Sequence, residues 1–389
     1  MNHSRSHILP FCFLLVSLLL ACAPPVTPPP VEATPVPTSL PQSSPTPARG
    51  QCGDGACTGP ETAANCPADC ATAPGATLEP TAVSTDAEAP LFFTTMTHLE
   101  GNFTDDENEQ VFLRHVEQLE YGLSLANEYG ARLTIESEEP FARACEIWDV
   151  NALQLVLDLG HGVGTHADVG FSSPTMSVDE LTQALAARKA LVDALVGPEN
   201  NRGTSGGGGP TDWVLAAHAA GFDYIDGVVG MHYLAMPLEN RPDPSWTDEY
   251  IRSQGYHIPI PPDFEDRIYP RMLQDAQDLQ SDEAGILLFS PGGIGRLDSM
   301  VEGDPQSCPR MRCDLTSEDV DAVVAQVEEA DRIRDPDRVA KLTLYIPLHL
   351  FDPQNEDGLR EFFARMADLE EQGVITWATQ GEVLDAYGE

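Results

Sequence analysis

Apolar residues over positions 90–389 follow two alternating patterns, and this alternation constrains the fold more than any other feature of the sequence. Short continuous runs such as 91–97 and 162–167 are typical of buried strands. Each is followed by a longer stretch with an apolar residue at every third or fourth position, which is typical of a helix. About eight strands, each followed by a crossover, indicate a parallel sheet that curls into a barrel. We therefore expect an α/β fold, an irregular (β/α)7-8 barrel, over residues 90–389.

Other elements follow from the same patterns. A helix is expected to end at Gly130, and Ser177 with Glu180 has the spacing of a capping box at the start of another helix. A proline-rich excursion over residues 231–284 interrupts the rhythm and is expected to lie over the mouth of the barrel. Further strands are expected near residue 202 and at 132–136, 223–229, 285–290, 342–348 and 374–379.

The first 21 residues have the pattern of a bacterial export signal. Arg5 supplies the positive end, and residues 8–20 form an apolar run that is too short to span a bilayer. The Leu-Leu-Ala-Cys run that ends at Cys22 resembles the lipobox of bacterial lipoproteins, in which this cysteine is acylated. We therefore expect residues 1–21 to be a signal peptide and the lipid on Cys22 to be the only membrane anchor. The protein is expected outside the cytoplasm, in the cell envelope.

Two spacers surround a small cysteine-rich module. Residues 22–50 are rich in proline and residues 71–89 are poor in large apolar residues, so both are expected to be extended linkers. The module at 51–70 is too short to bury a core, and disulfides are the expected cross-links in an oxidising compartment, with zinc as the rival. The three possible pairings stay open. Its cysteines are Cys52, Cys57, Cys66 and Cys70.

Three further cysteines lie in the barrel domain. Cys308 and Cys313 are close in sequence and are expected to close a small disulfide loop. Cys145 is then left without a partner and is expected to be a buried thiol.

The chain is strongly acidic, with 62 acidic against 21 basic residues and a formal net charge of −41. A surface of this charge repels phosphate backbones, so nucleic acid is not an expected partner. Solubility is the plain explanation for the excess of carboxylates, and it needs no specific cation binding.

Polar residues that can bind a metal follow three of the expected strands. His98 and Glu100 end the first strand, His166 and Asp168 end the third, and His349 follows a strand near the C-terminus. In barrels of parallel strands, chemistry is found where the strands end, and residues two apart on a strand point the same way. A single histidine in such a place is more often a structural residue. Because a histidine occurs at the ends of three strands, the pattern favours a site for zinc or a similar divalent ion.

Three stretches resemble, in this order, segments of the polysaccharide deacetylase (NodB-like) family of carbohydrate esterases. LDLGHGVGTHADVG resembles the family's Gly-His-Glu-Ile-Gly-Asn-His segment and places His166 on a metal-binding histidine. RGTSGGGGPTDWVLAAHAAGFDYIDG resembles its Arg-x-Pro-x-Gly loop, and LTLYIPLHLFDP with GVITWATQGEVL resembles its Leu-x-His strand and closing segment. The resemblance implies a metal-dependent hydrolase that removes N- or O-acetyl groups from a carbohydrate polymer.

The sequence departs from the family pattern at the site itself. The family's first strand ends Thr-Phe-Asp-Asp-Gly, where a general base precedes a metal ligand. Here Leu99 falls on the base and Glu100 on the ligand. The family's second metal histidine falls on Gly170, and Asp168 or His161 is the expected substitute. The proline of the Arg-x-Pro-x-Gly loop is missing as well.

The resemblance assigns roles to the remaining residues. His98 is expected to act as the base, His349 to protonate the leaving amine, and Arg202 to orient a carboxylate in the site. The expected ligands of the metal, with zinc as the expected ion, are Glu100, His166 and Asp168.

Carbohydrate contacts and two other functions complete the hypotheses. The aromatic residues expected to stack on sugar rings are Trp246, Tyr250 and Tyr256. One alternative is a catalytically inactive barrel that has lost its base and only binds a glycan. The other is a barrel glycoside hydrolase, in which Glu100 would face Asp168 or Asp226 across one glycosidic bond.

Overall fold

The computed structural model describes residues 88–388 with several gaps. The segments left out within this range are 101–103, 168, 170–174, 208–210, 229–246, 248–266, 277–283, 291 and 302–311. The expected signal peptide, the lipid site Cys22 and the cysteine-rich module at 51–70 lie outside the described residues. The same is true of Asp168, Gly170, Trp246, Tyr250, Tyr256 and Cys308. What was expected of these residues stays a prediction.

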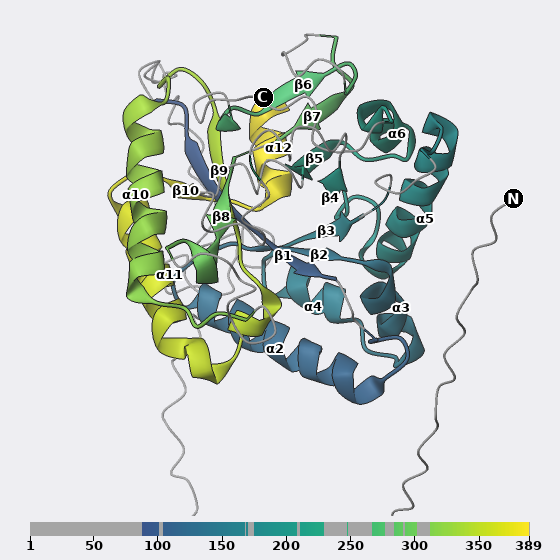
Figure 1. Ribbon diagram of the computed structural model, residues 1–389, viewed down its shortest axis with the longest axis horizontal. Coiled ribbons are helices and arrows are strands. Elements are labelled where there is room, and N and C mark those ends of the chain that lie inside the picture. Colours follow the sequence, from purple (N-terminus) through teal and green to yellow (C-terminus); the bar gives the residue numbers. More distant parts are fainter. Residues whose placement is uncertain are drawn as a thin grey trace, which may run out of the picture. The chain divides into compact units, whose positions relative to one another are not determined.

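The described strands form one curled, mostly parallel sheet, which confirms the predicted α/β barrel class (Figure 1). Its order is β6-β7-β5-β4-β3-β2-β1-β9-β8, and β10 pairs with β1. Every neighbouring pair is parallel except β6 with β7. The strands are β1 (Leu91–Leu99), β2 (Thr134–Ser137), β3 (Gly162–His166), β4 (Gly203–Gly207), β5 (Tyr224–Val228), β6 (Arg271–Leu273), β7 (Leu287–Phe289), β8 (Gly293–Arg296), β9 (Ala340–Tyr345) and β10 (Thr376–Trp377).

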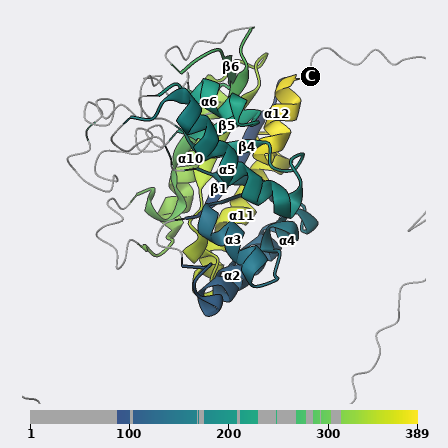
Figure 2. The ribbon, with the colours of Figure 1, turned by 90° about the vertical axis from the view of Figure 1, so that its right-hand side faces the viewer.

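Helices cover the outside of this sheet. Helices α10 and α11 lie together on one flank and α5 and α6 on the other, and Figure 2 brings α5 and α6 to the front. The helices are α2 (Glu109–Asn127), α3 (Glu139–Ile147), α4 (Ala152–Asp158), α5 (Val178–Val196), α6 (Trp213–Ala219), α10 (Ser317–Ile333), α11 (Glu356–Glu371) and α12 (Gln380–Gly388). In the part of the chain that the structure describes, no helix combines the length and the apolar character needed to cross a membrane.

Local signals set the ends of two of these helices, and the signals at Gly130 and at Ser177 with Glu180 were predicted. Asn108 caps α2 by accepting hydrogen bonds from the backbone N–H groups of Gln110 and Val111. The turn after α2 contains Gly130 at a φ of 72°, a conformation that glycine adopts without strain. Ser177 and Glu180 form a reciprocal capping box at the start of α5, as expected.

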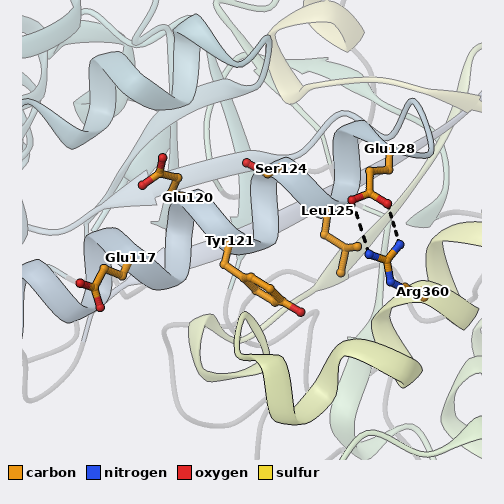
Figure 3. Close-up of a pocket in the computed structure, with 7 residues that line it drawn as sticks. All are labelled: Glu117, Glu120, Tyr121, Ser124, Leu125, Glu128 and Arg360. Carbon is orange, nitrogen blue, oxygen red and sulfur yellow. Dashed lines mark hydrogen bonds and ion pairs between the residues drawn. The ribbon is translucent and has the colours of Figure 1, made fainter. Parts of the chain in front are cut away.

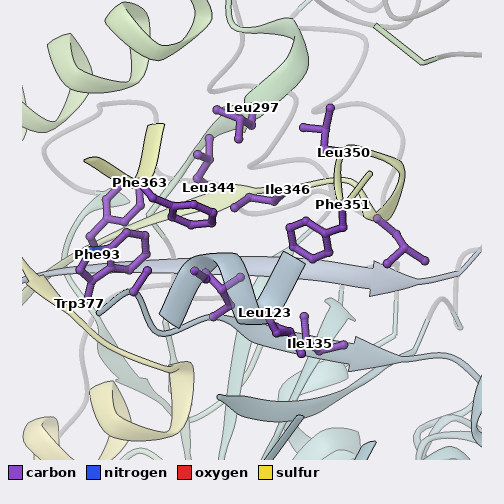
Figure 4. Close-up of a cluster of buried hydrophobic side chains, with 14 of the residues drawn as sticks. Phe93, Leu123, Ile135, Leu297, Leu344, Ile346, Leu350, Phe351, Phe363 and Trp377 are labelled. Carbon is purple, nitrogen blue, oxygen red and sulfur yellow. The ribbon is translucent and has the colours of Figure 1, made fainter. Parts of the chain in front are cut away.

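The main apolar core packs the sheet against its helices (Figure 4). Phe93 of β1 meets Trp377 of β10 edge to face, with ring centroids 5.0 Å apart. Phe363 of α11 and Leu123 of α2 are fully buried in the same cluster. Each such side chain contributes about 1.5–3 kcal/mol through burial. The sulfur of Cys145 is a free thiol buried in this core, as predicted, and burial raises its pKa to about 11.

The interior of the barrel is crowded, and glycines make room there for long side chains of neighbouring strands. A Cβ on Gly203 of β4 would lie 1.9 Å from the buried ring of Tyr224 on β5. A Cβ on Gly164 of β3 would lie 3.1 Å from Cγ of Glu136 on β2. The small residues on β3 and β4 therefore allow Tyr224 and Glu136 to cross the barrel interior.

Replacing Gly203 by alanine should destabilise the domain by about 1–3 kcal/mol, because the buried Tyr224 ring has to move to admit the new methyl group. Urea unfolding followed by circular dichroism measures the loss. Gly388→Ala is the matched control, since a Cβ there meets no atom within 4 Å, and its effect should stay within about 0.5 kcal/mol. Equal stability of the two variants would contradict this account of the interior.

Candidate metal centre

The carboxyl ends of β1 to β4 bring polar side chains to one edge of the sheet. The strand register places His98 of β1 opposite Glu136 of β2, and His166 of β3 opposite Ser205 of β4. Parallel neighbours in register point their side chains to the same face. Gly164 of β3 lies between Glu136 and β4. Because Gly164 has no side chain, the side chain of Glu136 can extend across β3.

The two histidines of this edge lie face to face. Their ring centroids are 3.9 Å apart with an interplanar angle of 19°. His98 Nε2 lies 3.1 Å from Glu136 Oε2. On the outer side of the rings, Glu100 Oε1 lies 3.4 Å from His98 Nδ1 and Glu100 Oε2 lies 2.7 Å from His166 Nε2. One carboxylate therefore bridges both rings at the mouth of the barrel.

Ser205 adds a hydroxyl to the inner side of the cluster. Its Oγ lies 2.8 Å from His166 Nδ1 and 3.2 Å from His98 Nε2. The same hydroxyl donates a hydrogen bond to Glu136 Oε2. Ser205 is fully buried, so water does not compete for these contacts.

These residues fit a divalent metal ion. One potential ligand atom from each of His98, Glu136 and His166 lies within 4.8 Å of the other two. Two imidazoles and one carboxylate form a donor set typical of zinc sites. Glu136 Oε1 is buried and has no hydrogen-bond partner among the described residues, which is costly unless a further group or ion compensates it. The cluster is thus positioned to bind a metal ion.

Further charged groups are buried beneath the cluster. Burial, followed by repulsion from Glu136, raises the pKa of Asp226 well above its usual value, which favours the protonated carboxyl. Burial lowers the pKa of Lys341 to about 7, although the attraction of the two carboxyl groups opposes this shift. The Lys341 ammonium donates to the backbone oxygen of Ser290 at 2.6 Å and to Gln380 Oε1 at 2.7 Å.

Glu100 is the part of the cluster nearest to solvent, with 32% of its side chain exposed. Partial burial alone would raise its pKa, but the charges and hydrogen bonds of His98 and His166 outweigh burial and hold the pKa well below its usual range. Glu100 therefore stays ionised at neutral pH. Tyr345 of β9 also reaches this carboxylate, with its hydroxyl 3.5 Å from Glu100 Oε1.

His349 belongs to a second group at the same end of the barrel. Its Nε2 lies 3.1 Å from Oδ2 of Asp298, a carboxylate that is itself fully buried. Arg296 donates two hydrogen bonds to Asp298, at 2.6 and 3.0 Å. Arg296 is also the partner of Tyr345 in the β8–β9 register, so this group adjoins the cluster through Tyr345.

Two expectations from the sequence were wrong because they placed residues at the wrong end of a strand. Arg202 precedes β4 and pairs with Asp223 at 3.0 Å and Asp385 at 2.6 Å. It lies three residues, or about 10 Å, before Ser205, and so does not orient a carboxylate in the site. His161 precedes β3 and is a structural histidine, because its Nδ1 accepts from the Leu133 N–H and its Nε2 lies 3.2 Å from the Leu123 oxygen.

Asp226 also cannot be one of the two carboxylates that a glycoside hydrolase would need. That carboxyl is 3% exposed and lies beneath the cluster, so it cannot flank a glycosidic bond that enters from solvent. Asp168, the other candidate for the pair, lies outside the described residues.

Sequence reasoning missed two of the central residues. Glu136 ends the expected strand at 132–136. A polar residue at the end of a strand is the same signal that indicated His98 and His166, so it could have indicated Glu136 as well. Ser205 lies in a glycine-rich run, and nothing in its immediate sequence distinguishes it.

Two hollows lie away from this edge of the sheet. One, of about 380 Å³, is lined by side chains of α2 and α11, where Arg360 pairs with Glu128 at 2.6 Å (Figure 3). The other, of about 260 Å³, surrounds Arg202 and His161 at the opposite end of the strands. Neither is lined by the residues of the cluster.

Comparison with known proteins gives likenesses of fold. No family model matches the sequence, and no curated protein matches it. Solved structures do align with the chain at low identity. The probable polysaccharide deacetylase from Pseudomonas aeruginosa PAO1 aligns over 77% of this chain and 91% of its own, with 12% identity and a TM-score of 0.46. PuuE allantoinase aligns over 78% of this chain and 91% of its own, with 11% identity and a TM-score of 0.47.

A third structure comes from another class of enzyme. The 4-alpha-glucanotransferase from Thermococcus litoralis aligns over 76% of this chain and 38% of its own, with 13% identity and a TM-score of 0.41.

The buried His161 should make the domain less stable in acid. Burial lowers its pKa from 6.5 to about 4, so the unfolded chain binds more protons between these values. We expect its contribution to be complete above pH 6.5 and to be lost as the pH falls toward 4, by roughly 3 kcal/mol in total. Urea unfolding at several pH values measures this. In His161→Gln the dependence should be shallower, whereas His218→Gln, a change at an exposed histidine of α6, should leave it unchanged.

Proposed function

We propose that the chain is a metal-dependent hydrolase that removes N- or O-acetyl groups from a carbohydrate polymer. The observation that carries this proposal is the convergence of His98, Glu136 and His166 at the carboxyl ends of three parallel strands. The resemblance of the surrounding sequence to polysaccharide deacetylases supports the choice of reaction. Zinc is the ion that suits two imidazoles and a carboxylate best.

The proposed roles differ from those expected from sequence. His98 belongs with the metal ligands, because its Nε2 faces Glu136 and Ser205. A divalent ion held there would polarise the acetyl carbonyl and lower the pKa of a water molecule toward roughly 7. Glu100 orients both rings and, as the ionised carboxylate at the mouth, is the group placed to accept a proton.

The leaving amine or alcohol needs a proton donor, and His349 is proposed for that role. Asp298 lies beside His349 Nε2 and is buried, so it fixes the orientation of the imidazole ring. Arg296 in turn fixes Asp298 through two hydrogen bonds. This order of contacts, from arginine to carboxylate to imidazole, keeps the donor in one position.

The location of the enzyme is part of the proposal. A signal peptide at 1–21, a lipid on Cys22 and a proline-rich tether at 22–50 would hold the barrel outside the cytoplasm, at the surface of the membrane. A tethered enzyme reaches a surface polymer without being lost to the medium.

The purified chain should hold about one divalent ion in the barrel and release acetate from an acetylated sugar polymer such as a chitin oligomer. A chelator should abolish the release, and zinc should restore it. Glu136→Gln should weaken metal binding more than the 10–100-fold that is typical of residues behind the ligands. His218→Ala, on the exposed face of α6, is the control. Bound metal without acetate release would favour the inactive glycan-binding barrel, and release that resists chelation would contradict the proposal.

His349→Ala should lower the rate of acetate release by about 10²–10⁴-fold and leave the metal content unchanged, because His349 donates a proton and does not hold the ion. Metal analysis and initial rates of both proteins measure this. A loss of metal in His349→Ala would show that the residue belongs to the metal centre. Asp298→Asn should lower the rate through the orientation of His349, with the metal again retained.

A further inference from the structure

The Ser205 hydroxyl occupies an unusual position inside the metal cluster. Its oxygen lies within hydrogen-bond distance of one atom from each of His98, Glu136 and His166. We propose that Ser205 is the fourth protein group of the metal centre and binds the ion through its hydroxyl oxygen. This inference rests on the proposed metal site and adds a residue to it.

A count of hydrogens supports the assignment. The carboxylate of Glu100 lies 3.4 Å from His98 Nδ1 and 2.7 Å from His166 Nε2, the outer nitrogens of the two rings, and a carboxylate accepts hydrogen bonds. In neutral rings the outer nitrogens then carry the hydrogens, which is how a carboxylate behind a ligand fixes the tautomer of a metal-binding histidine. The inner nitrogens are left with lone pairs that face Ser205.

Four acceptor atoms therefore meet on the inner side of the rings. They are His98 Nε2, His166 Nδ1, Glu136 Oε2 and Ser205 Oγ, and the single hydrogen of the Ser205 hydroxyl can be donated to only one of the other three atoms at a time. One hydrogen can satisfy one of these contacts. A cation satisfies all four, because every lone pair can point at it.

The position of Ser205 on its strand makes the inference testable. The hydroxyl of the preceding residue, Thr204, is already engaged, because it donates to the backbone oxygen of Ser205 at 3.0 Å. Thr204 is as deeply buried as Ser205, with 1% of its surface exposed. A cysteine at residue 204 therefore tests burial and folding, whereas a cysteine at residue 205 tests contact with the ion.

The experiment uses the full chain loaded with Co²⁺. A thiolate ligand to Co²⁺ produces a charge-transfer band in the near ultraviolet that oxygen and nitrogen ligands do not produce. We expect this band in the difference spectrum of Ser205→Cys against the unmodified chain, and we expect none for Thr204→Cys. The buried Cys145 and any cobalt held by the cysteine-rich module contribute equally to all three spectra and cancel.

Affinity for zinc, measured by competition with a chelator, gives a second readout that does not depend on activity. Ser205→Ala should weaken binding at least tenfold, and Ser205→Thr, which keeps the hydroxyl, should restore most of the affinity. If the barrel of the unmodified chain binds no ion, the proposed function fails. If it binds the ion, but Ser205→Cys lacks the band and Ser205→Ala keeps full affinity, the inference about Ser205 alone is overturned.

Discussion

Charge inside the barrel is the constraint on which the rest of the site depends. Glu136, Asp226 and Lys341 are almost completely buried, so protein groups have to replace the water that would otherwise stabilise their charges. Asp226 meets this requirement by retaining a proton, and Lys341 by donating to Ser290 and Gln380. The carboxylate of Glu136 faces the His98 imidazole and the Ser205 hydroxyl. The interior is therefore best neutralised by a cation at the open end, where the ligands already converge.

The fold could be predicted from the sequence because it depends on local patterns. Apolar runs and helical stripes indicated most strands and helices, and the parallel barrel follows from their alternation. Short elements were missed: α3 has nine residues and no long stripe, and β8 has four residues, two of them glycine. Such elements are stabilised by packing rather than by their own propensity.

The candidate site could be predicted only in part, because register and strand direction decide which residues meet. His98, Glu100 and His166 were recognised as polar residues at strand ends, and they do lie together. Glu136 joins them only because Gly164 leaves space on the neighbouring strand, which is a property of the sheet and not of either segment. Arg202 and His161 carried the expected chemistry but lie at the other end of their strands.

The two lysines of the chain have a consequence for chemical labelling. Lys341 is completely buried in the barrel interior, and Lys189 is 6% exposed and paired with Asp193 at 2.8 Å. A reagent that acylates amines therefore reaches neither group readily in the folded domain. Because burial excludes water and reagent alike, Lys341 can react only when the sheet opens and exposes its amine. The rate at which Lys341 is acylated would therefore report how often the interior of the barrel opens to solvent.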